Sequence, residues 1–114
     1  MTIRDELSAA ADAVAGIECT PLYRQTTETG HAFVKLDRTE YPNRLGGVEW
    51  WQVYVMLPAD RAEAEQFFED KKRLLYAALS ERMTVKSIRQ QDTVFEPGGP
   101  ALPTLVVEGH EAEE

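Results

Sequence analysis

The segment at residues 48–57 (VEWWQVYVML) constrains the fold more than any other part of the chain. Successive side chains of a β-strand point to opposite faces of the sheet. One face of this segment is wholly apolar and consists of Trp51, Val53, Val55 and Leu57. The other face carries large amphipathic groups, namely Trp50, Gln52, Tyr54 and Met56. We therefore predict a strand that is covered on both faces, by helices on the Trp51 side and by something else on the Trp50 side.

Two amphipathic helices are predicted to supply the cover on the Trp51 side. The first occupies about residues 2–16, with Thr2 and Asp5 as a capping pair and Gly16 as a left-handed stop. The second runs from about residue 60 to about residue 82, where Asp60 and Glu63 form a second capping pair. Apolar residues recur along both segments at the spacing of one helical face.

Four further segments read as strands, at residues 17–27, 32–36, 85–95 and 102–108, and the Pro- and Gly-rich run 96–100 joins the last two as a hairpin. The element order is α-β-β-β-α-β-β. We predict an α+β fold at residues 1–109, with one mixed, mainly antiparallel sheet of about five strands and both helices on one face. The acidic residues 110–114 are predicted to be a disordered tail.

Residues 37–47 (DRTEYPNRLGG) read as a polar loop that contains Arg38, Tyr41 and Arg44. Loops of this length inside a small domain are uncommon, and they are usually functional or ordered by a partner. Arg38 and Arg44 have acidic neighbours at Asp37 and Glu40 with which to pair. In an acidic protein, exposed arginines beside aromatic residues are also suited to meet the acidic surface of another copy.

The charge and cysteine content exclude several classes of function. Twelve basic and 20 acidic residues give a net charge of −8, which disfavours binding to nucleic acid or to anionic membranes. No secretion signal is recognisable, and no apolar run approaches the roughly 20 residues needed to span a bilayer. The single cysteine, Cys19, cannot form an intrachain disulfide. We expect a protein that is made in a reducing cytoplasm and has no membrane partner.

No residue pattern points to catalysis, a metal or a cofactor. His31 and His110 lie far apart in the sequence, without a cluster of ligands at metal-binding spacing. Cys19 and His31 would need a third, orienting group to act as a nucleophile and its base. The glycine pairs at 46–47 and 98–99 do not open a helix, as a phosphate-binding loop does. We therefore expect that the chain is not an enzyme and binds no metal or cofactor.

The aromatic residues carry the stronger signal. Tryptophan, tyrosine and arginine are the residues most enriched at protein–protein hot spots. Trp51 fits a core position, whereas Trp50 fits a core and an interface equally well. Two helices cannot cover both faces of a five-stranded sheet, so the Trp50 face is left short of cover within one chain. The predicted subunit interface comprises Arg38, Tyr41, Arg44, Trp50, Gln52, Tyr54 and Met56.

Several segments of the chain resemble small tail-terminator proteins of siphovirus-type bacteriophages that infect actinobacteria. These segments are 33–38 (FVKLDR), 40–43 (EYPN), 46–47 (GG), 50–53 (WWQV) and 57–58 (LP). The runs 64–67 (AEQF), 83–85 (MTV) and 101–109 (ALPTLVVEG) are similar to later parts of those proteins. The resemblance covers roughly residues 1–110 and consists of common residue types without a catalytic signature.

The resemblance implies a homohexameric ring in the virion, at the head–tail junction. Such a ring caps the tail tube, ends polymerisation of the major tail tube protein, and presents a surface to the head-completion (neck) proteins. DNA passes through the ring without specific binding, and an acidic lumen lets it slide. A ring subunit buries surface against two neighbours through a heterologous interface that closes.

Three other functions remain open on the sequence alone. The chain is suited to be a different neck protein, such as a head–tail adaptor. An acidic inhibitor or DNA mimic would use the carboxylates between Glu63 and Asp70. A ligand-binding or enzymatic α/β domain would need a pocket with convergent polar groups.

Overall fold

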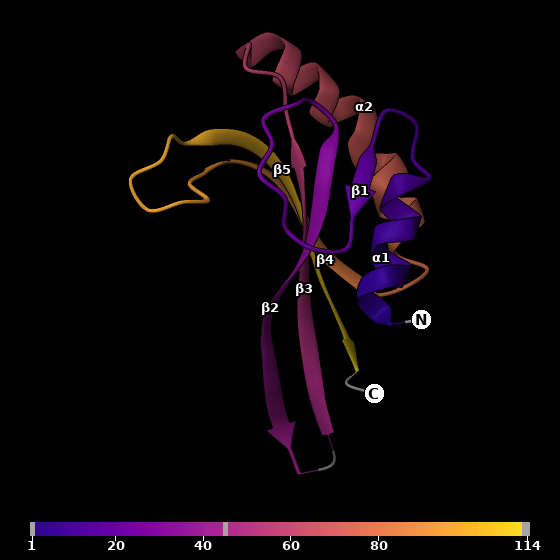
Figure 1. The fold of residues 1–114 in the computed structure, drawn as a ribbon. Helices are drawn as coiled ribbons and strands as arrows, with labels where there is room; N and C mark the ends of the chain where they lie inside the picture. Colours follow the sequence, from indigo (N-terminus) through magenta and orange to yellow (C-terminus); the bar gives the residue numbers. More distant parts are fainter. Residues whose placement is uncertain (1, 45, 113–114) are drawn as a thin grey trace.

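The computed structural model describes residues 2–44 and 46–112 and shows an α+β fold, as predicted (Figure 1). The elements are α1 (Ile3–Asp12), β1 (Glu18–Thr20), β2 (His31–Asn43), β3 (Gly46–Met56), α2 (Arg61–Leu79), β4 (Thr84–Thr93) and β5 (Leu102–Ala112). They form one five-stranded sheet in the order β1-β2-β3-β5-β4. β1 pairs with β2 in parallel, and the other pairs are antiparallel. The prediction of a mixed, mainly antiparallel sheet is confirmed.

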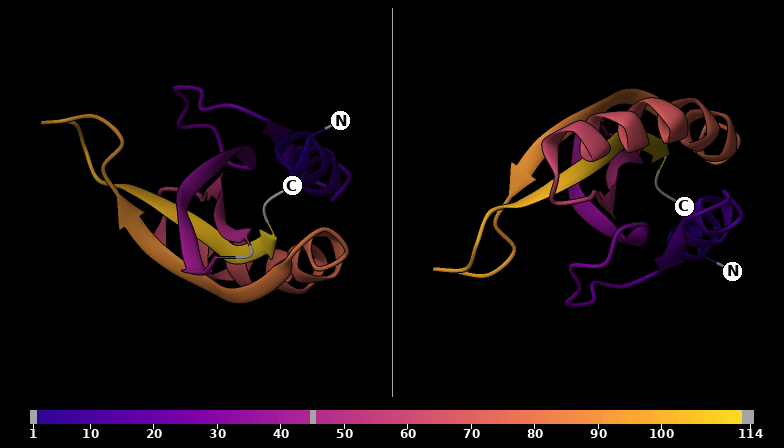
Figure 2. Two further views of the ribbon diagram at one scale, coloured as in Figure 1. Left: turned by 90° about the horizontal axis from the view of Figure 1, so that it is seen from below. Right: turned by 90° about the horizontal axis from the view of Figure 1, so that it is seen from above.

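Both helices cover the same face of the sheet, as predicted (Figures 1 and 2). Leu7 of α1 and Leu75 of α2 are fully buried in one cluster with Val53 of β3 and Leu105 of β5. Trp51 belongs to this cluster and is 4% exposed, which confirms its assignment to the core. Full burial of each large aliphatic side chain contributes about 1.5–3 kcal/mol to folding, so this face holds most of the hydrophobic stabilisation.

The first helix begins as its capping pair predicts. Thr2 Oγ1 accepts a hydrogen bond from the Asp5 N–H at 3.2 Å, and Asp5 Oδ2 accepts one from the Thr2 N–H at 3.3 Å. The second helix differs, because Asp60 occupies the N-cap position without a side-chain capping bond. The predicted capping box with Glu63 is therefore wrong. α2 also ends at Leu79, three residues before the predicted boundary, because residues 80–83 turn towards β4.

Lys71 joins the two helical segments. Its position on the apolar stripe of α2 is explained by its Nζ atom, which donates a hydrogen bond to the Ala15 carbonyl at 2.6 Å. Gly16 follows at φ 84°, and an added Cβ on nearby Gly30 would lie only 2.2 Å from the Gly16 carbonyl oxygen. The turn after α1 therefore packs directly on the turn before β2, at a distance that requires glycine.

The first strand is much shorter than the predicted segment at 17–27. β1 ends at Thr20, just before Pro21, which lacks the N–H that a sheet ladder needs. Residues 21–30 then cross to the face opposite the helices, where Tyr23 contacts Phe33 of β2.

Residues 37–43 and 46–47 are strand residues of a β-hairpin, so the prediction of an eleven-residue loop at 37–47 is wrong. β2 continues to Asn43 and pairs with β3 at Thr39↔Glu49, Glu40↔Val48 and Asn43↔Gly46, with two irregularities in register. Figure 1 shows this hairpin extending beyond both helices. Most of its described side chains are polar, since no helix covers them, and this polarity imitates the composition of a loop. Pro42 lies within the second irregularity, where a strand tolerates the loss of a donor.

The prediction that the tail at residues 110–114 is disordered is wrong for residues 110–112. β5 continues to Ala112 and pairs with β3 at Trp50↔His110, Glu49↔Glu111 and Val48↔Ala112. Strand pairing satisfies the backbone of these acidic residues although they have little apolar surface to bury. Glu113 and Glu114 lie outside the described residues.

Candidate functional site

A second hydrophobic cluster lies on the sheet face opposite the helices. Phe33, Tyr54, Met56 and Val106 form it, and Phe95 packs against them. The Phe33 ring stacks on Tyr54 at 5.4 Å and meets Phe95 edge-on at 5.4 Å. The Tyr23 ring covers Phe33 from the segment after β1, at 5.0 Å. We call this set, with Tyr23 and Phe95 included, the aromatic cluster.

The aromatic cluster changes the interpretation of three predicted interface residues. Gln52 is 6% exposed, Tyr54 6% and Met56 2%, all through contacts within one chain. The prediction that they need a partner to cover them is therefore wrong. The segments at 21–30 and 94–101 lie over Tyr54 and Met56, whereas Gln52 is held by hydrogen bonds to Tyr54 and Glu108. Alternation along a strand carries no information about where such loops pass.

A chain of hydrogen bonds explains the amphipathic character of this face. The Tyr54 hydroxyl donates to Gln52 Oε1 at 2.8 Å, and Gln52 Nε2 donates to Glu108 Oε2 at 3.0 Å. Arg89 of β4 lies 3.8 Å from the same carboxylate. Burial raises the pKa of Tyr54, so its hydroxyl keeps the proton that it donates. These polar groups are satisfied across three strands of one chain.

Trp50 lies at the base of the hairpin, next to the body of the sheet, where it is half-buried between two side chains. The Arg38 guanidinium stacks over its ring at 4.5 Å, and the His110 ring lies 4.8 Å away. Arg38 also forms ion pairs with Asp37 and Glu40, as their proximity in the sequence predicts. The hydrogen bond from Arg38 to Asp37 raises the pKa of the guanidinium further.

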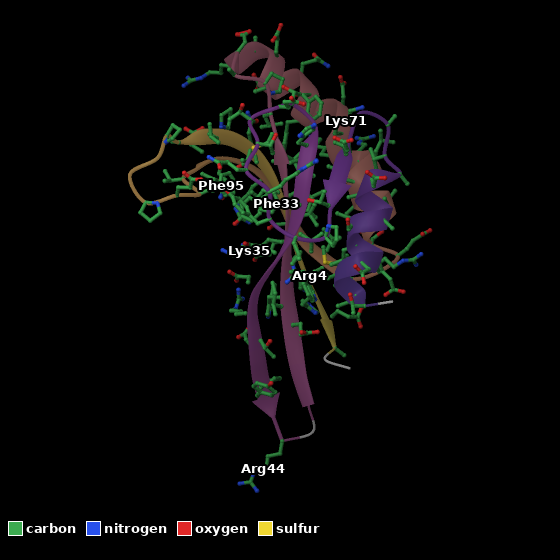
Figure 3. The ribbon with its side chains drawn as sticks, viewed as in Figure 1. Arg4, Phe33, Lys35, Arg44, Lys71 and Phe95 are labelled. Carbon is green, nitrogen blue, oxygen red and sulfur yellow. The ribbon has the colours of Figure 1, made fainter. Side chains whose placement is uncertain are left out.

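Tyr41 and Arg44 lie further along the hairpin. Tyr41 is 65% exposed, and Arg44 is exposed at the tip, pointing away from the body (Figure 3). The seven predicted residues therefore fall into three groups: Gln52, Tyr54 and Met56 under the aromatic cluster, Arg38 and Trp50 at the base of the hairpin, and Tyr41 and Arg44 beyond it. We call residues 37–44 and 46–50 the arm.

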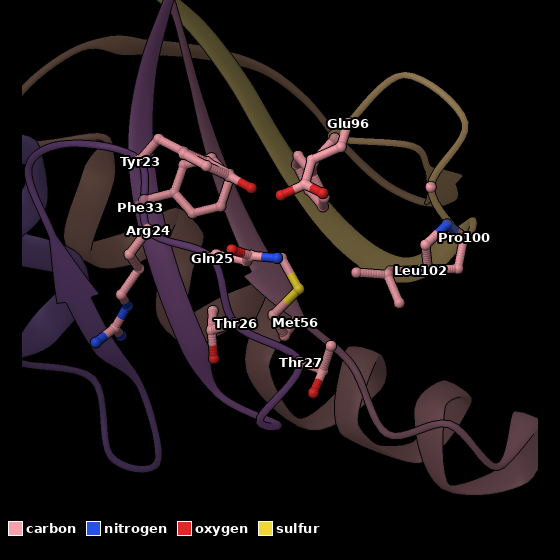
Figure 4. A pocket seen from close by; sticks show the side chains of 12 residues that line it. Tyr23, Arg24, Gln25, Thr26, Thr27, Phe33, Met56, Glu96, Pro100 and Leu102 are labelled. Carbon is pink, nitrogen blue, oxygen red and sulfur yellow. The ribbon is translucent and has the colours of Figure 1, made fainter.

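A cavity of about 90 Å³ lies beside the aromatic cluster, between the segments 21–30 and 94–101. Phe33, Met56 and Leu102 contribute apolar lining. Figure 4 shows the side chains of Tyr23, Gln25 and Glu96 lying towards one another at this cavity. The sequence does not reveal this cavity, because Gln25 and Glu96 lie in irregular segments that are 71 positions apart and carry no shared motif.

His31 and Cys19 each have partners that explain them without a catalytic role. His31 Nε2 lies 2.9 Å from Glu18 and 3.0 Å from Glu28, so the fold does bring carboxylates to this histidine although their spacing did not suggest it. This cluster ties the 21–30 segment to β1.

Burial raises the pKa of Cys19 to about 11, which keeps the thiol protonated and unreactive at neutral pH. Within residues 2–44 and 46–112, no group of three or more His, Cys, Asp or Glu side chains is arranged to hold a metal ion.

Comparison with known proteins leaves the family open. No protein-family model matches the chain, and no curated protein matches it in sequence. Among the described residues, neither helix has the length and apolar content needed to cross a bilayer.

Proposed function

We propose that this chain is a structural virion protein that forms a ring on the end of a phage tail tube. The ring ends polymerisation of the tube protein and joins the tail to the head-completion proteins. The chain acts by assembly and not as an enzyme. The observation that carries this proposal is the arm, which extends beyond both helices and bears four of the seven predicted interface residues (Figure 1).

The arm is suited to intersubunit contact by its structure. A two-stranded ribbon is only marginally stable when it stands alone in water. Among the described residues, no third strand pairs with the arm beyond Val48, where the last pairing to β5 is with Ala112. Docking on a neighbour would bury this ribbon, and exposed Tyr and Arg side chains are typical anchors for such contacts.

The arm and the body of the sheet are different surfaces, which supports a heterologous contact. When the arm of one copy meets the body of the next, every copy repeats the contact and the assembly closes into a ring or extends as a filament. The resemblance to tail terminators described above favours the closed ring. The net charge of −8 is compatible with DNA sliding through a lumen without being bound.

Infection with a phage that lacks this protein tests the proposal. We expect overlong tails, because nothing stops polymerisation of the tube protein. Complementation with the wild-type chain should restore a uniform tail length, and complementation with a chain lacking residues 40–47 should not. Tails of normal length that fail to join heads would instead identify a head–tail adaptor. Electron cryo-microscopy of intact particles without a ring of this chain at the head–tail junction would disprove both.

A further inference from the structure

We infer that the cavity beside the aromatic cluster is the receptor for Arg44 at the arm tip of another copy of this chain. This inference rests on the proposed function, because it names the contact that would join one subunit of the ring to the next. The ligand is a guanidinium group, held by one carboxylate, two neutral polar groups and an aromatic edge.

The chemistry of the cavity favours a cation of side-chain size. The Glu96 carboxylate, the Gln25 amide and the Tyr23 hydroxyl face one another, and none of them forms a hydrogen bond or an ion pair within the described part of the chain. The other charged residue of the lining, Arg24, is held by the carboxylate and the backbone carbonyl of Glu18. Glu96 is therefore the uncompensated charge. A volume of about 90 Å³ is well below the roughly 300–1,000 Å³ of small-molecule sites, so a single side chain fits better than a metabolite.

Arg44 is the complementary group on the arm. It is exposed, points away from the body, and has no ion pair with the described residues (Figure 3). Arg38, the other arginine of the arm, is already compensated by Asp37 and Glu40. A guanidinium forms planar, paired hydrogen bonds with a carboxylate and also stacks on aromatic rings, and the cavity offers both Glu96 and Tyr23.

The geometry of the chain excludes this contact within one copy. Met56 lines the cavity at one end of β3, and Arg44 lies just beyond Gly46 at the other end. A strand rises about 3.4 Å per residue, so the two ends of this 11-residue strand are separated by about 34 Å. The tip therefore reaches the cavity of a second copy, whose own tip remains free for a third. This is the repeating, heterologous contact that a ring requires.

Disulfide trapping on the full-length chain tests the contact. Equal amounts of Arg44→Cys and Gln25→Cys proteins are mixed, oxidised and mapped by mass spectrometry. We expect a disulfide that joins positions 44 and 25 between two copies, in large excess over links between identical positions. Arg82→Cys, at an exposed arginine on the helix side, replaces Arg44→Cys in the control mixture and should form no specific link to position 25. If the Arg44→Cys mixture gives no more of the 44–25 link than the control, the inference is overturned.

Charge reversal separates this inference from the ring itself. By sedimentation velocity, Arg44→Glu and Glu96→Arg should each weaken self-association about tenfold or more, and the double variant should regain most of the loss. Arg82→Glu and Glu81→Arg are the matched controls and should change little. Rings that persist in both single variants would overturn the arm-to-cavity contact and leave the proposed ring standing. Trapped 44–25 links combined with normal tail length in the deletion phage would support the contact and refute the terminator function.

Discussion

The two faces of the sheet are built differently although they share the same strands. The helix-covered face is mostly aliphatic, and both helices contribute fully buried side chains to it, such as Leu7 and Leu75. The opposite face is aromatic and polar, and two irregular segments cover it through Tyr23 and Phe95. Two helices cover the first face, whereas the loops leave a cavity and a half-exposed Tyr23 at the edge of the second. The first face therefore provides most of the stability, and the second holds the cavity on which the proposed contact rests.

The largest effect is expected on the helix-covered face. Trp51→Glu places a carboxylate at a site that is 4% exposed, at a cost of more than about 4 kcal/mol. Since small domains are stable by about 5–15 kcal/mol, we expect a largely unfolded or aggregated protein by circular dichroism. Trp51→Phe, which keeps an apolar ring, is the control and should stay folded. A cooperatively folded Trp51→Glu protein would show that this face does not carry the stability.

A smaller loss is expected from the aromatic cluster. Phe33 is 2% exposed and contacts three other rings, so Phe33→Ala should lower the free energy of unfolding by about 3–4 kcal/mol in urea titration. Tyr23→Ala should cost only about 1 kcal/mol, because that side chain is 50% exposed. Equal losses in the two variants would mean that Tyr23, in the covering segment, is as well packed as Phe33 of β2 beneath it.

Each face of the sheet buries one weakly acidic group, the Cys19 thiol on the helix side and the Tyr54 hydroxyl on the other, and both should lower the stability at alkaline pH. The pKa of Cys19 is raised to about 11 by burial, above its value in the unfolded chain. Its contribution is therefore complete below about pH 9 and is lost as the pH rises through about 11, by about 2–3 kcal/mol.

Urea titrations between pH 8 and 11 should follow this loss, and Cys19→Ala should flatten it. The raised pKa of Tyr54 acts in the same direction, so Tyr54→Phe should remove a second part. If the pH dependence of the Cys19→Ala protein equals that of the wild type, the thiol is not the source of the loss.

The smallest effect on stability is expected at Trp50, with a large effect on assembly. Its contacts with Arg38 and His110 are half-exposed, so Trp50→Glu should cost about 1 kcal/mol or less in thermal or urea unfolding. The same variant should fail to form rings by electron microscopy, because a carboxylate replaces a proposed anchor on the arm. Trp50→Phe serves as the control. Unfolding of the Trp50→Glu monomer would place Trp50 with the core, and intact rings would remove it from the interface.

The sequence predicts the fold class and the helix-covered face well. The alternation at residues 48–57 assigns Trp51, Val53 and Val55 to the core, and the structure confirms this assignment. The spacing of apolar residues locates both helices, and Thr2 with Asp5 marks the first helix start. These features are local, because a residue and its neighbours three or four positions away suffice to define them.

The cover of the aromatic face and the strand structure of the arm could not be predicted from the sequence, because they depend on contacts between distant segments. Polar residues 37–47 read as a loop, but cross-strand pairing with β3 makes them a ribbon. The cover over Tyr54 comes from Tyr23 and Phe95, which alternation along β3 cannot place.

The amino-acid sequence by itself therefore determined the α+β class, the buried strand face and the capped first helix, because periodicity and capping are local properties. Only the tertiary structure decided how the Trp50 face is covered, that residues 110–112 extend β5, and that Tyr23, Gln25 and Glu96 meet at one cavity. The physical reason is that hydrophobic burial specifies that a face must be covered, whereas the path of the loops decides which residues cover it.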